Sequence, residues 1–449
     1  MVKMPHWPIP MGYTYKDIDL MHMKRLLQLL GNPHTKLPPT IHITGTNGKG
    51  STLAFLRSIF SNCGYKVHSY SSPHLIQFNE RICLSNRTIS DQQLHRYIEK
   101  CRTVADAHPE IRCSFFEYTT AIAFCAFADI AADILIMEVG LGGIVDATNV
   151  VEHSDISVIT SISYDHINVL GDSLQSIAKE KVGIIKKESI CIVGWQHKEV
   201  ADIVRDKCNE LHTRCLGCGE EWDFFVKDDE LYIQFHEKEC SDIVKALGKS
   251  VFGPYKPSLI GIHQRLNASV AIVTSLILSL YRNHTFAVKK IIDSMPNALS
   301  KTKWSGRMER IDSGPLFAAL PSPDWELWMD GAHNPAAAEM LAASFANLTP
   351  QKPLYIIHGR SADRDIEGFL MHMQQLNPRM LCCVFIKSEP KAENPEKIYK
   401  IAKGMSLPSF IYDYASDALA GILADAKANG INEARVLVCG SLYLMGDLY

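Results

Sequence analysis

The stretch Ile41-His-Ile-Thr-Gly-Thr-Asn-Gly-Lys-Gly-Ser-Thr52 decides the fold of this chain. The pattern predicts a strand over residues 40–44 and a helix over residues 48–63. A glycine-rich turn between a strand and a helix directs backbone N–H groups and the helix N-terminus toward an anion, as in a phosphate-binding P-loop. We expect Lys49 to neutralise β- and γ-phosphate charge and the hydroxyl of Ser51 to reach Mg²⁺.

The loop differs from the strict Walker pattern at two positions. Ile43 occupies the place of the first glycine, and Gly50 follows the lysine. The alternative is an ordinary glycine-rich turn that opens a helix. The strand before the loop, the helix after it and the lysine favour phosphate binding over that alternative.

Short apolar strands alternate with helical patterns beyond this loop. Residues 66–70, 133–139 and 156–162 read as strands, and residues 91–107 and 116–127 read as helices. Continuous apolar strands joined through helices are typical of a parallel sheet that is buried on both faces. The first part of the chain is therefore predicted to be a P-loop-containing parallel-sheet ATPase domain of the α/β class.

A second α/β series follows a polar segment near residues 301–304. Five short apolar runs alternate there with helical patterns: LWMD, LYIIH, LCCVFI, SFIYD and VLVCG. They predict a smaller Rossmann-like C-terminal domain. We place the N-terminal domain at residues 1–302 and the C-terminal domain at residues 303–449. Within the first domain we also expect a β-hairpin over residues 219–235 and a long apolar helix over residues 265–281.

The composition is that of a globular chain without a strong overall charge. Its 449 residues are 47% hydrophobic and 21% charged, and the formal net charge is -3. This argues against nucleic acid and against an anionic membrane surface as partners. The longest apolar stretch, residues 121–139, contains Asp129 and Asp133 and is too short and too charged to span a bilayer.

The cysteines and the first residues indicate a reducing compartment. Residues 1–11 contain no apolar core of a secretory signal, and the 13 cysteines form no even framework, so we expect the cytoplasm. Cys215 and Cys218, with Cys208 and Cys240 nearby, have irregular spacing and no histidine pair. The spacing therefore does not favour a zinc site.

TGTNGKGS resembles the P-loop variant of the Mur ligase superfamily. The glycine after the lysine resembles the folylpolyglutamate synthase/dihydrofolate synthase branch of that superfamily. The resemblance continues in order over nearly the whole chain. It rests on SSPHL (residues 71–75), NERI (79–82), FEYTT (116–120), EVGLGG (138–143), DATN (146–149), DH (165–166), AKEK (178–181), HQ (263–264), GR (306–307) and DGAHNP (330–335).

The resemblance implies that residues of both domains bind ATP. It gives Asp330 to the ribose and Asn267 to the nucleotide pocket, while Arg307 and His333 contact the phosphates. Taken alone, the DGAHNP motif also fits an Asx-type helix cap. The implied nucleotide-binding residues are Thr46, Asn47, Gly48, Lys49, Gly50, Ser51, Asn267, Arg307, Asp330 and His333.

Glu138 is a candidate metal ligand. It closes an apolar strand directly before a glycine-rich turn, where α/β proteins bind ligands and where a carboxylate suits a hard cation. The alternative is a glutamate that only caps its loop. The resemblance implies two Mg²⁺ sites, one with Ser51, Ser72 and Glu138 and one with Glu138, His166 and Lys181. It also implies that the lysine is carbamylated, which turns an ammonium into a carboxylate-like ligand.

His166 and Lys181 have simpler interpretations when the resemblance is set aside. A lone histidine is more often a structural residue than a ligand. Lys181 also fits a surface helix, where it would pair with Glu180 or Glu188.

The implied activity is that of an ATP-dependent amide ligase. The γ-phosphoryl group would pass to a carboxylate of dihydropteroate or of a reduced folate, and the amine of L-glutamate would attack the resulting acyl phosphate. The expected catalytic residues are Lys49, His166 and Lys181. Asp146 and Ala147 belong to the DATN motif, which resembles a pterin-binding element. We expect the enzyme to be a monomer.

Other functions stay open at the level of sequence. The chain could be a monofunctional folylpolyglutamate or dihydrofolate synthase. A muramyl-peptide ligase is less consistent, because we would expect threonine in place of Gly50 and an added N-terminal UDP-binding domain. A nucleotide-dependent switch protein would not need the GR and DGAHNP motifs.

The sequence departs from the family pattern at three places. Ile144 stands where family members usually have arginine, which leaves the pterin contact and the acceptor preference open. Residues 314–325 lengthen the spacing between Arg307 and Asp330. Arg364 replaces the lysine of a common Ala-Asp-Lys-Asp motif.

Overall fold

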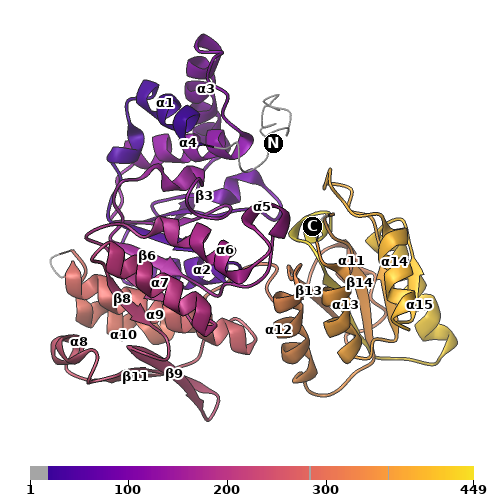
Figure 1. Ribbon diagram of the computed structural model, residues 1–449. Coiled ribbons are helices and arrows are strands. Elements are labelled where there is room, and N and C mark those ends of the chain that lie inside the picture. Colours follow the sequence, from indigo (N-terminus) through magenta and orange to yellow (C-terminus); the bar gives the residue numbers. More distant parts are fainter. Residues whose placement is uncertain (1–18, 283–284, 363, 449) are drawn as a thin grey trace. The chain divides into compact units, whose positions relative to one another are not determined.

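The computed structural model describes residues 19–282, 285–362 and 364–448. The chain forms two compact units (Figure 1). The larger holds Met1–Ser163, Ile167–Ser258 and Gln264–Lys303, and the smaller holds Tyr164–His166, Leu259–His263 and Trp304–Tyr449. Two short segments from the first part of the chain thus belong to the smaller unit, whose long segment begins at Trp304, one residue after the start expected from the sequence.

The larger unit is built on an eight-stranded sheet in the order β4-β3-β2-β5-β1-β6-β7-β8. The six strands from β2 to β8 in this order are parallel, and β3 and β4 form an antiparallel edge. The central strands are buried along their whole length, which explains their continuous apolar sequences. The strands are β1 (Thr40–Thr44), β2 (Val67–Tyr70), β3 (Ile82–Leu84), β4 (Arg87–Thr88), β5 (Ile134–Glu138), β6 (Ile156–Ile159), β7 (Ile190–Val193) and β8 (Arg214–Gly217).

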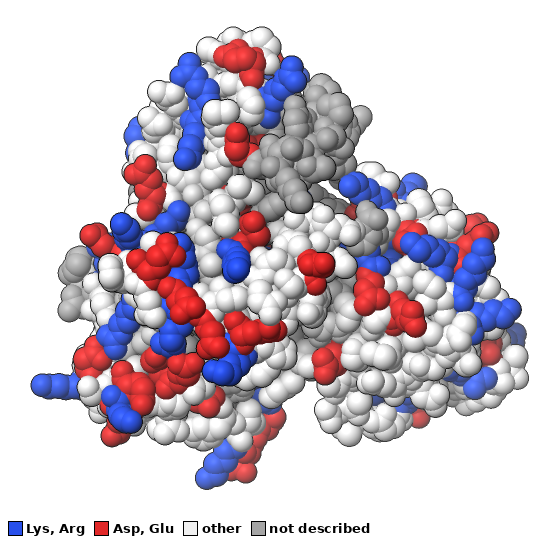
Figure 2. Space-filling model, viewed as in Figure 1, with Lys and Arg blue, Asp and Glu red and all other residues white. Residues whose placement is uncertain are grey.

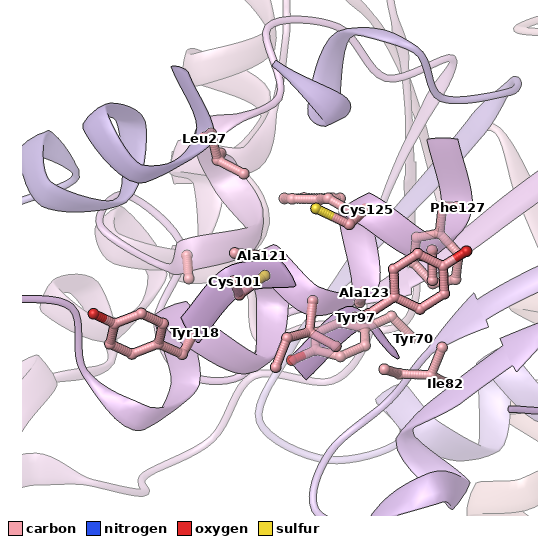
Figure 3. Close-up of a cluster of buried hydrophobic side chains, with 14 of the residues drawn as sticks. Leu27, Tyr70, Ile82, Tyr97, Cys101, Tyr118, Ala121, Ala123, Cys125 and Phe127 are labelled. Atoms are coloured by element: carbon pink, nitrogen blue, oxygen red, sulfur yellow. The ribbon is translucent and has the colours of Figure 1, made fainter. Parts of the chain in front are cut away.

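Helices pack on this sheet in separate apolar clusters. One cluster joins α1, α3 and α4 to β2 and β5 and includes Leu27, Tyr97 and Phe127 (Figure 3). Ser90 and Ser114 begin α3 and α4 with capping boxes, which satisfy N–H groups of the first helical turn. The helices are α1 (Met21–Leu29), α2 (Lys49–Asn62), α3 (Asp91–Ala107), α4 (Phe115–Asp129), α5 (Ile167–Leu170), α6 (Leu174–Lys181), α7 (Lys198–Glu210), α9 (Ile262–Tyr281) and α10 (Val288–Lys301).

A small three-stranded antiparallel sheet completes the larger unit, together with α8 (Ser241–Leu247). It contains β9 (Trp222–Lys227), β10 (Glu230–Phe235) and β11 (Val251–Tyr255). The turn between β9 and β10 has left-handed backbone at Asp228 and Asp229, with φ of 52° and 64°. Aspartate tolerates this conformation, which suits a two-residue hairpin turn. The predicted hairpin is confirmed.

The smaller unit contains a six-stranded sheet in the order β12-β13-β17-β14-β15-β16. All its strands are parallel except the edge strand β12. The last strand of the chain, β17, lies between β13 and β14, so the strand order reverses at this point. In α/β sheets ligands bind at the carboxyl ends of the strands where the order reverses, so we expect ligand-binding residues at the carboxyl ends of β13, β17 and β14. The strands are β12 (Glu309–Ile311), β13 (Glu326–Asp330), β14 (Leu354–His358), β15 (Met380–Cys383), β16 (Ser409–Ile411) and β17 (Arg435–Cys439).

Helices separate these strands, as the alternating pattern predicted. They are α11 (Pro315–Ala318), α12 (Pro335–Ala346), α13 (Ile366–Gln375), α14 (Pro395–Gly404), α15 (Ala415–Ala428) and α16 (Leu442–Gly446). The predicted α/β class, with a parallel-sheet first unit and a Rossmann-like second unit, is confirmed. The segment expected as an inserted loop contains the short helix α11.

A buried ion pair joins the beginnings of β13 and β17. Nε of Arg435 lies 2.8 Å from Oε2 of Glu326, which also accepts a hydrogen bond from Nε1 of Trp328 at 3.0 Å. Nζ of Lys352 lies 3.2 Å from the other carboxylate oxygen. Burial opposes ionisation of Glu326, but these three donors lower its pKa to about 2.

The charged side chains and the apolar helices of the described residues can be followed in the structure. On the face shown in Figure 2, acidic and basic side chains are interspersed. No helix in the described part of the chain is long and apolar enough to cross a membrane.

Candidate functional site

The P-loop follows β1, and α2 begins at Lys49. The loop is held to the segment after β6: the backbone N–H groups of Thr46 and Asn47 donate to the carbonyl of Ser161 at 2.8 and 3.2 Å. Oγ1 of Thr160 donates to the carbonyl of Asn47 at 2.8 Å. These bonds fix the loop at the carboxyl edge of two adjacent parallel strands, with the first N–H groups of α2 at its end.

Two glycines are required for the shape of this loop. Gly45 and Gly48 have φ of 151° and 90°, a region that L-residues other than glycine rarely adopt. A Cβ atom on Gly45 would overlap Oγ1 of Thr160, and one on Gly48 would overlap Oδ1 of Asn267. Asn267 on α9 therefore lies directly against the P-loop, and its role in the nucleotide pocket stays a prediction.

Two lysines converge on one carbonyl of the loop. Nζ of Lys49 and Nζ of Lys181 each donate to the carbonyl oxygen of Gly45, both at 2.9 Å. Lys49 also donates to the carbonyl of Thr46 at 3.3 Å. Lys181 is only 4% exposed, at the end of α6. The interpretation of Lys181 as a surface residue is therefore wrong.

Glu138 and the SSPHL segment reach the same edge of the sheet. Glu138 is the last residue of β5, pairs in register with Ile43 of β1, and is 5% exposed. The N–H of Ser72, which follows β2, donates to Oε2 of Glu138 at 3.3 Å. Ser51 is 1% exposed in the first turn of α2. Because β2, β5 and β1 are adjacent, the segments carrying Ser51, Ser72 and Glu138 all lie at one carboxyl edge.

The glycine-rich turn after Glu138 is organised by Asp146. Its carboxylate accepts from the N–H of Leu141 at 2.9 Å and from both the N–H and the hydroxyl of Thr148, at 3.0 and 2.5 Å. Asp146 is the N-cap of the short 3-10 helix η4 (Ala147–Val150), in which Ala147 is 3% exposed. Nε2 of His42 lies 2.9 Å from the same hydroxyl. Burial raises the pKa of Asp146 and lowers that of His42 to about 3.

These bonds also fix a proton arrangement. The hydroxyl of Thr148 has a single hydrogen, which it donates to Asp146, so a neutral His42 must donate its Nε2 hydrogen to the same hydroxyl. This buried chain of three side chains was not anticipated from the sequence, because its members are separated by as many as 106 positions.

The same turn packs against the helix that carries Lys181. The N–H of Ile144 donates to the carbonyl of Glu180 at 3.1 Å. A Cβ atom on Gly143 would come within 2.5 Å of that carbonyl, so glycine allows the close approach. The side chain of Ile144, where the family usually has arginine, is 46% exposed. An acceptor bound to this turn would therefore lie close to α6.

In the smaller unit, Asp330 ends β13 and organises the next turn. Its two oxygens accept from the N–H groups of Met308 and Ala332, each at 2.8 Å. Nη1 of Arg307 donates to the carbonyl of Gly306 at 2.9 Å, and this carbonyl accepts from the N–H of Gly331. Arg307 and Asp330 are thus brought together. Asn334 caps α12 through the N–H of Ala337, so the helix-cap interpretation of DGAHNP also holds.

His333 belongs to a polar cluster around Asp165. Nε2 of His333 lies 3.3 Å from Oδ2 of Asp165, and Nδ1 lies 2.8 Å from the carbonyl of Gly331. Asp165 is also bound by Nη1 of Arg364 at 2.5 Å and by Nδ2 of Asn334 at 3.1 Å. Burial opposes ionisation of Asp165, yet the surrounding donors hold its pKa well below its usual range. Burial lowers the pKa of His333 despite this carboxylate.

His166 is exposed, with φ of 50°, and its Nε2 lies 3.3 Å from Nη2 of Arg364. It belongs to the smaller unit, whereas Glu138 and Lys181 belong to the larger. Ligation of one Mg²⁺ by these three residues therefore stays a prediction. In the described residues, no group of three or more His, Cys, Asp or Glu side chains is arranged to hold a metal ion.

Arg360, which follows β14, was not anticipated from the sequence. Its side chain is 1% exposed, Nη1 donates to the carbonyl of Asp365 at 3.0 Å, and Nη2 donates to the carbonyl of His333 at 3.4 Å. The feature of the sequence that could have indicated this residue is the Gly359-Arg360 pair directly after a buried strand. Arg360 supports the turn that presents His333.

Comparison with known proteins gives the same assignment as the fold and the loop. The class is that of a P-loop nucleotide-binding ligase: residues 43–275 match the family model of the Mur ligase middle domain. Residues 316–449 match the model of the dihydrofolate synthetase C-terminal domain. The chain belongs to the folylpolyglutamate synthase/dihydrofolate synthase family of the Mur ligases, which are ATP-dependent ligases.

The relatives cover nearly the whole chain. It is 30% identical to dihydrofolate synthase/folylpolyglutamate synthase of Bacillus subtilis, over 96% of this chain and 94% of the relative. It is 28% identical to dihydrofolate synthetase of Saccharomyces cerevisiae, over 96% and 97%. Among solved structures, FolC of E. coli in complex with DHPP and ADP has a TM-score of 0.79 and 26% identity, over 96% of this chain and 92% of that one.

Proposed function

We propose that this ligase joins L-glutamate to the carboxylate of dihydropteroate and to the γ-carboxylate of reduced folates. A carboxylate oxygen of the acceptor attacks the γ-phosphorus of ATP, which forms an acyl phosphate and releases ADP. The amine of glutamate then attacks the acyl carbon, the C–O bond to phosphate breaks, and the amine loses a proton. The products are an amide, ADP and phosphate.

The observation that carries this proposal is the gathering of groups at one sheet edge of the larger unit. The P-loop, Glu138 and the Ser72 backbone all lie where β1, β5 and β2 end, and Lys49 and Lys181 both contact the Gly45 carbonyl. This arrangement supplies N–H donors and cationic charge for a triphosphate. Since phosphoryl transfer requires mainly positioning and charge neutralisation, these groups suit the first step.

The nucleotide-binding set proposed from the sequence includes residues of the smaller unit. Arg307 and His333 provide phosphate contacts, and Asp330 contacts the ribose. The proposal is supported by their positions at the carboxyl end of β13, the ligand-binding edge of a Rossmann-like sheet. The structure of E. coli FolC with ADP supports nucleotide binding by this family.

Two Mg²⁺ ions are part of the proposal. The buried carboxylate of Glu138 beside the Ser72 segment provides the hard oxygen ligand that Mg²⁺ prefers, with Ser51 in the first turn of α2. Bound Mg²⁺ would neutralise charge on the phosphate oxygens. Carbamylation of Lys181 is chemically reasonable because two ammonium groups share one carbonyl acceptor, and conversion to a carbamate removes this like-charge repulsion.

A monofunctional dihydrofolate synthase is a second candidate function. The match of residues 316–449 to the model of the dihydrofolate synthetase C-terminal domain favours it. Such an enzyme would use dihydropteroate and leave tetrahydrofolate unextended.

The test is a rate assay with an acceptor panel. The full chain is incubated with MgATP and L-glutamate, and ADP release is measured with dihydropteroate, with tetrahydrofolate or with no acceptor. We expect glutamate-dependent ADP release with dihydropteroate and with tetrahydrofolate. Release with dihydropteroate alone would select the monofunctional candidate. Release no faster than in the acceptor-free control would refute the proposed function.

A further inference from the structure

The segment of residues 160–163, directly after β6, anchors the P-loop in the larger unit. The carbonyl of Ser161 accepts hydrogen bonds from the N–H groups of Thr46 and Asn47, at 2.8 and 3.2 Å. Oγ1 of Thr46 donates to the carbonyl of Ser163 at 3.0 Å, and Nδ2 of Asn47 donates to its Oγ at 3.3 Å. The path of this segment therefore determines where two residues of the P-loop lie.

The backbone of this segment changes its pairing direction at Thr160. The N–H of Thr160 donates to the carbonyl of Thr44 in β1 at 2.8 Å, whereas its own carbonyl accepts from Nε2 of Gln196 at 2.7 Å. In a regular strand the N–H and the carbonyl of one residue face the same neighbouring strand. The change coincides with the end of β6 at Ile159, and it turns the next carbonyl, that of Ser161, toward the P-loop.

The carboxamide of Gln196 takes the place of a peptide group in a neighbouring strand. The N–H of Gly194, just after β7, still bonds to the end of β6 at 2.9 Å. Beyond this point the side chain of Gln196 continues the pairing: Nε2 donates to the carbonyl of Thr160, and Oε1 accepts from the N–H of Ile162 at 3.0 Å. A residue of a parallel strand makes the same two bonds around its partner, which here is Ser161.

These two bonds contribute direction more than stability. Gln196 is half-buried, so it adds little apolar surface to the core. Water can replace its bonds in part, because the carbonyl of Thr160 and the N–H of Ile162 are only partly buried. A water molecule does not hold both groups in one orientation, whereas the rigid carboxamide does. Loss of the carboxamide should therefore change the geometry of the segment more than the stability of the fold.

We propose that Gln196 is a positioning residue for nucleotide binding. It holds the carbonyl of Ser161 toward the P-loop, and this carbonyl fixes Thr46 and Asn47. Without the carboxamide, the peptide group after Thr160 can rotate into the regular strand direction, which turns the Ser161 carbonyl away from the loop. The P-loop must then be ordered when the nucleotide binds, and this ordering lowers the affinity. The inference rests on the nucleotide site of the proposed function and adds a residue that supports it.

The test is titration calorimetry of the full chain with MgADP. Gln196→Met keeps the length of the side chain and removes both hydrogen bonds. We expect the Kd for MgADP to rise about tenfold, because ordering the backbone of one residue corresponds to roughly this change in an equilibrium constant. The KM for ATP should rise by a similar factor, while the KM for L-glutamate stays unchanged. The midpoint of urea unfolding should stay within about 0.5 M of the wild type.

Two further variants make the comparison specific. Gln374→Met is the matched control: Gln374 lies on α13 in the smaller unit, and its Nε2 also donates to a backbone carbonyl, that of Met405, at 2.7 Å. This variant should leave the Kd for MgADP unchanged. Gln196→Asn retains a carboxamide that is about 1.5 Å shorter in reach and so cannot bridge both backbone groups. It should weaken MgADP binding in the same direction, and it replaces Gln196→Met if that variant does not fold.

Three results would overturn the inference. The first is a wild-type Kd for MgADP in a folded Gln196 variant. The second is a lower urea midpoint with an unchanged Kd, because Gln196 would then be a structural residue only. The third is an equal loss of affinity in Gln374→Met. Since calorimetry needs no acceptor, a chain that binds MgADP as expected but fails the acceptor-panel assay would refute the proposed function and support this inference.

Discussion

Replacement of Lys181 by methionine should remove activity without unfolding the protein. Methionine keeps most of the apolar volume of a side chain that is 4% exposed. It loses the bond to the Gly45 carbonyl, and a hydrogen bond to a charged group contributes about 1.5–3 kcal/mol. It also removes the cost of burying an ammonium group beside Lys49, which acts in the opposite direction. We therefore expect the free energy of unfolding to change by less than about 2 kcal/mol.

The effect on catalysis should be much larger. If Lys181 contributes charge or a metal ligand at the phosphoryl group, its loss should lower kcat/KM about 1,000-fold, equivalent to about 4 kcal/mol of transition-state stabilisation. Glutamate-dependent ADP release gives the rate, and urea unfolding gives the stability. Lys179→Met, at an exposed position of the same helix, is the control and should retain activity. A folded Lys181→Met enzyme with kcat/KM within about threefold of the wild type would refute the assigned role.

Three further perturbations follow from the structure. Gly48→Ala should weaken ATP binding at least about tenfold in calorimetry, because its φ of 90° and the side chain of Asn267 both exclude a Cβ atom. The control is Gly64→Ala, where φ is 76° and the nearest atom to an added Cβ, Nζ of Lys290, is 3.8 Å away. This control should strain the backbone similarly and leave ATP binding intact. Ile144→Arg should lower the KM for the pterin acceptor several-fold in the rate assay, and an unchanged KM would exclude this position from the acceptor site. Glu326→Gln should destabilise the protein by about 3 kcal/mol at pH 7, since it leaves a buried arginine without its carboxylate. Because the folded pKa of Glu326, about 2, is below its usual 4.5, the wild type should lose this stability as pH falls from 4.5 toward 2, and the variant should lack that loss in acid unfolding curves.

Local sequence patterns predicted those features that depend on neighbouring residues. The P-loop, its flanking strand and helix, and the alternation of strands and helices in both units are set by hydrophobic periodicity and glycine positions. The strand expected over residues 156–162 ends earlier, at Ile159, because Thr160 turns its hydroxyl to the P-loop carbonyl of Asn47. The strands β3, β4 and β12 near the sheet edges have two or three residues, which is too few to show the alternating hydrophobic pattern that predicts a strand.

Contacts between distant residues could not be predicted in this way. Lys181 reaches Gly45 across 136 positions, and Arg364 reaches Asp165 across 199. The sequence indicated the residue types at these places but not their burial or their partners. The family resemblance predicts a role for Lys181, and the fold explains why a lysine at the end of an amphipathic helix is buried against the P-loop.

The central claim is that the acceptor carboxylate is activated as an acyl phosphate. The direct measurement uses dihydropteroate whose carboxylate oxygens carry a heavy-oxygen label, with MgATP and L-glutamate, and follows the label in inorganic phosphate by mass spectrometry. Since the attacking carboxylate oxygen leaves with the phosphoryl group, one labelled oxygen should appear in each phosphate released during amide formation. Phosphate that remains unlabelled while the amide product accumulates would contradict this mechanism.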